Sequence, residues 1–206
     1  MLLIVLVIVA GLLVGIALGG DARTLSELRL RWWPLAIIGL VLQLVPVPSM
    51  SGQLDHWLAV GLLVASYMVL LIFVVMNIKL PGFPLIALGF ALNLLVISVN
   101  GGMPVTEDAI HDAYGRRSSA EVTRLRQRGG AKHHLARDDD VFLPLADVIP
   151  VGAPFHQVLS VGDLVFMAGV FWVIAAGTKG AAGRHRLGAT RGSPASRDRA
   201  RSAPEL

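Results

Sequence analysis

The run WLAVGLLVASYMVLLIFVVM, from Trp57 to Met76, contains no charged residue. At ~1.5 Å per helical residue it is long enough to cross the ~30 Å hydrocarbon core of a bilayer. Four further apolar runs lie at Leu2–Leu18, Trp32–Val45, Phe83–Val99 and Leu159–Ala176. The sequence therefore predicts an all-α integral membrane protein with five transmembrane helices.

The composition agrees with this fold class. Hydrophobic residues make up 54% of the chain and charged residues 16%, whereas a soluble domain carries ~25% charge. Of the 32 charged residues, 29 lie in three segments, Asp21–Arg31, Glu107–Asp147 and Lys179–Glu205. An ordinary soluble domain is excluded. The absence of cysteine also excludes disulfides, thiolate nucleophiles and sulfur-ligated metals.

The basic residues predict the orientation. If the N-terminus lies outside, the cytoplasmic segments hold all seven basic residues of the tail together with Arg23, Arg29, Arg31 and Lys79. The short outer segment Val47–His56 holds no lysine or arginine. Because cytoplasmic segments are enriched in these residues, the N-out, C-in topology is favoured. A cleaved signal peptide is the alternative for the first run, but no basic residue precedes that run.

A tandem repeat is indicated when the chain is compared with itself at an offset of 50 residues. The matching units cover about residues 8–45 and 58–95, and Pro34, Gly39 and Gln43 fall on Pro84, Gly89 and Asn93. Two out–in–out hairpins of this kind would form a parallel repeat. The alternative is a coincidence between two leucine-rich segments.

The sequence thus divides into four parts. Residues 1–99 form a four-helix transmembrane region, residues 100–158 an extracytoplasmic loop, residues 159–176 the fifth helix, and residues 177–206 a disordered basic cytoplasmic tail. In the loop, Thr106 and the pair Ser118 and Glu121 predict the starts of two helices that form a hairpin. Three prolines then predict an extended segment. The tail is expected to attract anionic lipid headgroups, and nucleic-acid binding is disfavoured.

Two features inside the predicted spans invite a functional hypothesis. Gln43 and Asn93 each lie ~15 Å along their helices, which places both near the membrane midplane. They are either interhelical hydrogen-bonding groups or the lining of a substrate site at the repeat interface. The glycines Gly11, Gly15 and Gly19 share one helix face. This face predicts close packing within the bundle, with a membrane-protein partner, or in a homo-oligomer.

A candidate polar cluster gathers at the outer face. It contains the turn Asn100, Gly101 and Gly102 and four ionisable residues, Lys132, His133, Asp147 and Asp163. Because an unpaired carboxylate among apolar neighbours is costly, we expect both aspartates to fold back towards the turn. At least one should pair with Lys132, a neighbouring arginine or backbone N–H groups. The cluster is then either a polar latch that holds the loop on the bundle or an active site.

No metal or cofactor is predicted. The loop contains His133, His134, Asp138, Asp139, Asp140, Asp147 and His156. They follow no ligand motif such as HExxH, so a solvated charge run is the favoured interpretation. Serines are plentiful, but none lies in a Gly-x-Ser-x-Gly motif. No catalytic residue is assigned on this basis.

Four motifs resemble a known family. They are NGGMPV (Asn100–Val105), the pair Lys132-His133, LADVIPV (Leu145–Val151) and SVGD (Ser160–Asp163). Together they resemble the bacterial multipass membrane family called domain of unknown function 5317. The resemblance implies a multi-pass protein of the bacterial plasma (inner) membrane and implies no activity.

Three functions from different classes remain open. The favoured one is a structural or accessory membrane protein that docks partners or lipid at its outer face. A transporter of small solutes or lipids would use the pair Gln43 and Asn93 at the repeat interface. An extracytoplasmic enzyme would use Lys132, His133, Asp147 and Asp163. A polar midplane cavity would favour the transporter, and convergence of the four loop residues would favour the enzyme.

Overall fold

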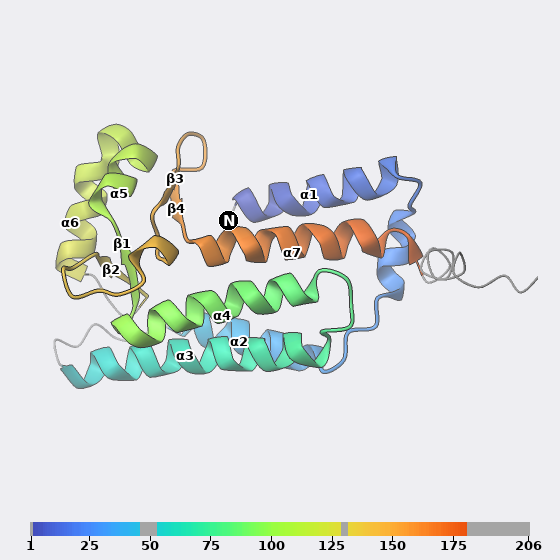
Figure 1. Cartoon of the computed structure of the whole chain (residues 1–206), viewed down its shortest axis with the longest axis horizontal. Coiled ribbons are helices and arrows are strands. Elements are labelled where there is room, and N and C mark those ends of the chain that lie inside the picture. Colours follow the sequence, from blue (N-terminus) through green and yellow to red (C-terminus); the bar gives the residue numbers. More distant parts are fainter. Residues whose placement is uncertain (1, 46–52, 129–131, 181–206) are drawn as a thin grey trace, which may run out of the picture.

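The computed structural model describes residues 2–45, 53–128 and 132–180, and the chain is mostly helical (Figure 1). Two helices, α3 (Gln53–Met76) and α4 (Phe83–Asn100), are long and apolar enough to cross a membrane. Three shorter apolar helices run beside them: α1 (Leu2–Ala17), α2 (Trp33–Leu44) and α7 (Val161–Gly177). Each apolar run of the sequence thus forms a helix.

The helices pack in an order that differs from the chain order. α2 packs on α3, α3 on α4, α4 on α7, and α7 on α1 (Figure 1). Two equivalent hairpins would require α1 to pack on α2 as α3 packs on α4. Instead, α1 packs mainly on α7, at the other side of the bundle. The packing therefore does not reproduce the parallel repeat of two-helix units.

The sequence similarity at an offset of 50 residues corresponds to a structural similarity between two single helices, α2 and α4. Trp32 and Gly82 precede α2 and α4, and both have left-handed backbone conformations, with φ of 56° and 85°. A proline in the first turn follows in each helix, where its missing N–H has no helical partner. The repeated signal thus describes how α2 and α4 begin.

Glycines bring α4 and α7 into backbone contact. A Cβ atom added to Gly89 would lie 2.6 Å from the Gly162 carbonyl oxygen, and one added to Gly169 would lie 2.7 Å from the backbone nitrogen of Ile86. Real Cβ atoms do not approach other atoms so closely. The small residues therefore set the distance between the two helices, as is common in membrane bundles. This close crossing places Asn93 of α4 against the first turn of α7.

The predicted glycine face of α1 is occupied within the same chain. A Cβ atom at Gly11 would lie 2.9 Å from the Phe171 carbonyl oxygen, and one at Gly15 would lie 2.4 Å from Thr178 Oγ1. Gly19 lies beyond the helix end, and no described atom lies within 4 Å of a Cβ atom added to it. Because α7 covers Gly11 and Gly15, these two glycines pack within the bundle, which is one of the alternatives that the sequence leaves open.

The connection between α3 and α4 is tied to the start of α2 by Asn77. Its side-chain Nδ2 donates to the carbonyl oxygens of Arg31 (2.9 Å) and Phe73 (2.8 Å). Its Oδ1 accepts from the Arg31 N–H at 2.8 Å. At the same end of the bundle, Thr24 in the 3-10 helix η1 (Ala22–Glu27) donates to the Gly177 carbonyl at the end of α7. The turns at this end are thus closed by hydrogen bonds.

At the other end of the bundle, called the loop end below, residues 101–128 and 132–159 form a small cap (Figure 1). It contains α5 (Glu107–Tyr114), the 3-10 helix η2 (Gly115–Arg117) and α6 (Ser118–Arg128). The predicted starts of these helices differ in detail. Thr106 makes no side-chain cap bond, and Ser118 has helical angles (φ −57°, ψ −42°), so it is not a capping residue.

Two small sheets complete the cap. β1 (Met103–Val105) pairs in parallel with β2 (His133–Leu135), and β3 (Ile149–Val151) pairs antiparallel with β4 (Gln157–Leu159). The 3-10 helix η3 (Leu143–Leu145) lies between β2 and β3. An isolated bridge joins Val105 to Asp147. These pairings hold the segments around residues 132 and 147 against the chain that leaves α4.

A buried apolar cluster joins the cap to the bundle. It combines Leu63 of α3 and Val96 and Ile97 of α4 with Met103 and Ala146 of the cap. A second cluster lies towards the opposite end, around Phe73, Val74, Phe83 and Ile86. The cap is therefore packed on the helices rather than suspended above them.

Candidate functional site

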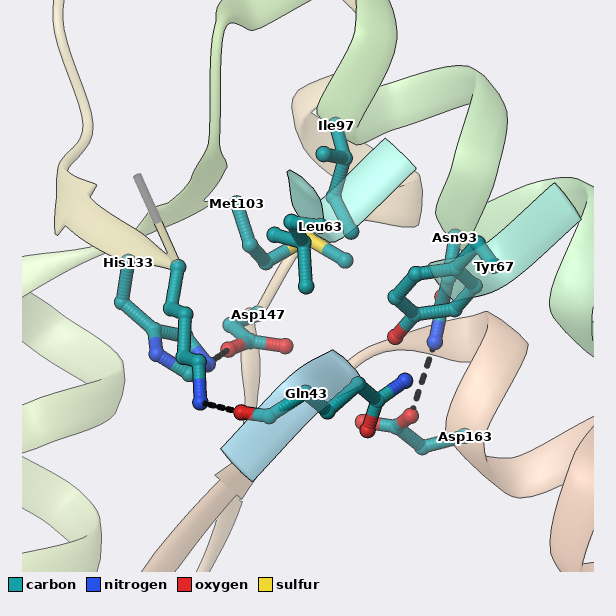
Figure 2. A pocket seen from close by; sticks show the side chains of 10 residues that line it. Gln43, Leu63, Tyr67, Asn93, Ile97, Met103, His133, Asp147 and Asp163 are labelled. Carbon is teal, nitrogen blue, oxygen red and sulfur yellow. Dashed lines mark hydrogen bonds and ion pairs between the residues drawn. The ribbon is translucent and has the colours of Figure 1, made fainter. Parts of the chain in front are cut away.

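A cavity of about 140 Å³ lies where the cap meets the helices (Figure 2). Its lining comes from α2, α3, α4, α7 and the cap: Gln43, Leu63, Tyr67, Asn93, Ile97, Met103, Lys132, His133, Asp147 and Asp163. Four of the seven residues of the predicted outer-face cluster therefore line the same cavity as both members of the predicted midplane pair. From the sequence these residues form two separate groups.

Asp163 is held by a closed set of hydrogen bonds at the start of α7. Its Oδ1 accepts from Asn93 Nδ2 at 2.8 Å (Figure 2), and its Oδ2 accepts from the Ser160 N–H at 3.1 Å. Ser160 Oγ accepts from the Asp163 N–H at 3.0 Å and donates to Asn93 Oδ1 at 2.9 Å. The reciprocal bonds between Ser160 and Asp163 form a capping box. The carboxyl group of Asp163 thus pairs with a backbone N–H, one of the expected partners.

Asp147 is buried but poorly partnered. Its backbone is fixed beside β1, because its N–H donates to the Pro104 carbonyl and its own carbonyl accepts from the Thr106 N–H. The residue is only 5% exposed, and one carboxyl oxygen lies 3.5 Å from His133 Nε2. Among the described residues, no group donates a hydrogen bond to its carboxyl oxygens within ordinary distance. A buried carboxyl group in this state is costly to ionise.

The electrostatics of the cavity follow from that burial. Desolvation, and after it the repulsion from Asp163, raise the pKa of Asp147 to about 8, so the group is mostly neutral at pH 7. Desolvation also lowers the pKa of His133. The side chain of His133 nevertheless keeps 53% of its surface exposed, and water limits this effect. The contact between Asp147 and His133 at pH 7 is therefore mainly between neutral groups.

Lys132 takes a different partner from the expected one. Its ammonium group donates to the backbone carbonyl of Gln43, the penultimate residue of α2, and it pairs with neither Asp147 nor Asp163. The exposed lysine therefore ties the cap to the end of α2. A helix C-terminus carries unsatisfied carbonyl groups that attract cations, which explains this choice of partner.

The two members of the amide pair lie at different places in their helices. Gln43 lies in the last turn of α2, since that helix ends at Leu44, whereas Asn93 lies close to the middle of α4. Both side chains nevertheless line one cavity. Their depth in a membrane stays a prediction.

The turn Asn100-Gly101-Gly102 supports the cap without lining the cavity. Gly101 and Gly102 have φ of 65° and 147°, conformations that glycine adopts without steric cost. The Asn100 side chain donates to the Val96 and Val141 carbonyls and accepts from the Val141 N–H. The turn thus fastens residue 141 of the cap to the end of α4.

Tyr67 is the polar lining residue that sequence reasoning missed. From the sequence, Tyr67 and Ser66 are polar groups expected to be satisfied inside the bundle. Figure 2 shows the Tyr67 hydroxyl pointing towards the cavity. Tyr67 lies one helical turn after Leu63, on the same face of α3, and both side chains line the cavity. This shared face is the sequence feature that could have identified it. Ser66 Oγ is buried without a hydrogen-bond partner among the described residues, so that interpretation is wrong for Ser66.

The other histidines of the loop lie apart from the cavity. His134 Nε2 lies 3.1 Å from both carboxyl oxygens of Asp140, and the two side chains are nearly buried. His156 Nδ1 lies 2.9 Å from the Ala113 carbonyl. Within residues 2–45, 53–128 and 132–180, no three histidine or carboxylate side chains are grouped to hold a metal ion.

Comparison with known proteins gives a family but no activity. Residues 27–175 match the family described as "Family of unknown function (DUF5317)". An uncharacterized protein of Thermotoga maritima is 31% identical over 157 residues, which covers 75% of this chain and 80% of the relative. No solved structure matches the chain. On the length of this match, the chain belongs to the family of unknown function DUF5317.

Proposed function

We propose that the chain is a multi-pass protein of the bacterial plasma membrane in which α1, α2, α3, α4 and α7 all cross the bilayer. The outward faces of these helices support this proposal, because large apolar side chains such as Leu13, Ile72 and Trp172 are exposed on them. Apolar surface of this extent is unfavourable in water and suits lipid. Trp32 and Trp33, exposed at the start of the short helix α2, suit a membrane interface.

The arrangement of the ends supports an N-out, C-in orientation. Successive bundle helices run in alternating directions, so the start of α1 and the cap lie at one end and Gly177 at the other (Figure 1). The basic residues Arg23, Arg29, Arg31 and Lys79 belong to the connections opposite the loop end. This is the distribution that places the loop end outside the cell. The basic residues of the tail, most of which lie outside the described residues, would then face the cytoplasmic leaflet.

The function that the geometry supports best is binding of a small polar group at the outer face, in an accessory role. The single observation that carries this proposal is the convergence of seven polar side chains on one cavity under the cap: Gln43, Tyr67, Asn93, Lys132, His133, Asp147 and Asp163. Ligand sites combine an enclosed space with a few convergent polar groups. The headgroup of a lipid from the outer leaflet, or a small solute, fits this description.

An extracytoplasmic enzyme is the second candidate. It is favoured by the contact of 3.5 Å between His133 and Asp147 at the cavity, since such a pair can transfer a proton. A transporter, the third hypothesis, would use the same cavity, which Gln43 and Asn93 line. If a bound compound changes chemically during incubation with the purified protein, the enzyme hypothesis would be favoured over the binding proposal.

The binding proposal is tested by native mass spectrometry of the full chain extracted from bacterial membranes. We expect a small molecule or lipid to remain bound to the wild type. Leu63→Phe, which enlarges a cavity-lining side chain, should lose it. Leu58→Phe is the matched control, because Leu58 is exposed on the same helix and lies outside the cavity. Retention of the same molecule by both variants, or by neither variant nor wild type, would contradict the proposal.

The orientation is tested by cysteine labelling, since the chain has no native cysteine. Arg126→Cys places a thiol on exposed α6 of the cap, and Lys79→Cys places one in the exposed connection between α3 and α4. A maleimide that cannot cross membranes should label the first variant in intact cells and the second only after lysis. The reverse pattern would contradict the proposed topology.

A further inference from the structure

We propose that the cavity at the loop end binds a primary ammonium group, held between the carboxyl groups of Asp147 and Asp163, with the Tyr67 hydroxyl as a further acceptor. The inference rests on the proposed function and names the ligand chemistry of the same site. The ammonium group can belong to a free amine or to an ethanolamine lipid headgroup, which share this chemistry.

The size of the cavity limits the ligand. The cavity measures about 140 Å³. Pockets for complete drug-sized ligands measure about 300–1,000 Å³. The site is therefore matched to the end of a molecule, such as an aminoethyl group.

The charges of the lining favour a cation. Asp147 and Asp163 both line the cavity, and the repulsion between them contributes to the raised pKa of Asp147. An anion would add to this repulsion, whereas a cation between the two groups relieves it. Lys132, the cationic side chain of the lining, is exposed and donates to the Gln43 carbonyl. A divalent metal ion is poorly served, because the described residues supply no group of three histidine or carboxylate ligands.

The hydrogen-bonding capacity of the lining favours a primary ammonium group among the cations. Such a group has three N–H donors and no acceptor. Asp147 is nine-tenths buried, and no described group donates a hydrogen bond to its carboxyl oxygens. Each carboxyl oxygen of Asp163 accepts one hydrogen bond, which leaves it a further lone pair. A quaternary ammonium group has no N–H donor and cannot satisfy these acceptors.

Binding should also displace a proton. The titratable groups that line the cavity with Asp147 are Asp163 from α7, Tyr67 from α3, His133 from β2, and Lys132, which directly precedes β2. Burial raises the pKa of Asp147 to about 8, so the free site holds a proton at pH 7. An ammonium group favours the ionised carboxylate, and the proton then passes to water. The affinity should therefore rise with pH up to about 8 and level off above it.

The test is isothermal titration calorimetry on the detergent-solubilised full chain with ethanolamine, choline and glycerol. We expect ethanolamine to bind at least about tenfold more tightly than choline or glycerol, because charge-assisted hydrogen bonds are the strong ones. At pH 7, titrations in buffers of different ionisation enthalpy should show release of close to one proton. Asp147→Asn should weaken ethanolamine binding about tenfold or more and abolish the proton release.

Asp140→Asn is the matched control. Asp140 is a buried carboxyl residue of the same cap, but it pairs with His134 and lies outside the cavity. Its substitution should leave the affinity for ethanolamine unchanged. If Asp147→Asn does not fold, Tyr67→Phe provides a second variant, which removes only an acceptor hydroxyl. Tyr67→Phe should weaken ethanolamine binding and leave choline binding unchanged.

The source of the ammonium group is decided by native mass spectrometry after reconstitution into nanodiscs. Retention of phosphatidylethanolamine but not phosphatidylglycerol supports the lipid headgroup. Binding of free ethanolamine without lipid retention supports a soluble amine. Preferential binding of choline, glycerol or phosphatidylglycerol would overturn the ammonium inference while leaving a ligand-binding cavity in place. Absence of binding by every probe, with no co-purifying molecule, would overturn the proposed function as well.

Discussion

The two ends of the helix bundle each bury a polar side chain to the same degree, but only one of these side chains has all its hydrogen-bond partners. Asn77, opposite the loop end, is 4% exposed, and all its polar atoms make hydrogen bonds, with Arg31 and Phe73. Asp147, at the loop end, is 5% exposed, accepts no hydrogen bond from the described residues at its carboxyl group and borders a cavity. A satisfied polar group such as Asn77 is explained by structure alone. The carboxyl group of Asp147, which lacks hydrogen-bond donors, indicates where a ligand would supply them.

The largest expected effect comes from a substitution that forces α4 and α7 apart, because both helices line the cavity. Gly89→Ala places a methyl group 2.6 Å from the Gly162 carbonyl oxygen. The atoms that this methyl group would meet are backbone atoms of Gly162 and Phe166. They cannot make room unless α7 moves away from α4. We expect a loss of about 3 kcal/mol of stability and loss of ligand binding, measured by thermal unfolding in detergent.

Gly61→Ala is the control for this prediction. Gly61 lies on the exposed side of α3, and no described atom lies within 4 Å of its added Cβ atom. We expect its stability to stay unchanged or to rise slightly, because alanine favours the helix. Equal losses from both substitutions would show that α4 and α7 are not in close backbone contact.

Asp147→Asn should change how stability depends on pH. The folded pKa of Asp147, about 8, lies above its ordinary value of 3.8. The group therefore contributes stability that is fully present below about pH 4 and is lost as the pH rises through 8. Each pKa unit corresponds to ~1.4 kcal/mol, and water that enters the site reduces this amount. Between pH 5 and pH 8 we expect the wild type to lose about 2 kcal/mol relative to the variant.

The measurement is thermal unfolding of both proteins across this pH range, with Asp140→Asn as the control. Parallel pH profiles for wild type and Asp147→Asn would show that Asp147 is ionised at neutral pH in the folded state. The two ends of the bundle would then no longer differ in the way described here.

A smaller effect is expected at the satisfied end. Asn77→Ala removes three hydrogen bonds and leaves backbone groups of Arg31 and Phe73 without a partner. The expected loss is about 1.5 kcal/mol, with no change in ligand binding, because Asn77 lies at the end away from the cavity. Ser26→Ala, which removes one exposed hydrogen bond, serves as the control. A change in ligand affinity in Asn77→Ala would contradict the separation of the two ends.

The helices are predictable from the sequence because apolar runs report directly on them. The predicted run Phe83–Val99 corresponds to α4 (Phe83–Asn100), and Leu2–Leu18 corresponds to α1 (Leu2–Ala17). The packing order is not predictable, since an apolar helix of uniform composition does not specify which neighbour it contacts. The repeated glycines Gly39 and Gly89 illustrate this point, because they contact different helices, α3 and α7.

The candidate site is predictable in its parts but not in its assembly. Lys132, His133, Asp147 and Asp163 are identified by charge in an apolar context, and Gln43 and Asn93 by their amides. Their convergence depends on the pairing of β1 with β2, strands of three residues that are too short to show a periodic pattern. The parallel register then sets which loop residues meet the helices. Tyr67 is missed because a tyrosine in an apolar helix usually only packs.

The central claim is that Asp147 is a neutral, incompletely satisfied carboxyl group in a ligand site. Infrared difference spectroscopy on the full chain at pH 7, before and after ethanolamine is added, tests this claim most directly. We expect a band of a protonated carboxyl group that disappears when the amine binds and is absent from Asp147→Asn. A band that is absent from the wild type, or that is unchanged by saturating ethanolamine, phosphatidylethanolamine and glycerol, would contradict the claim.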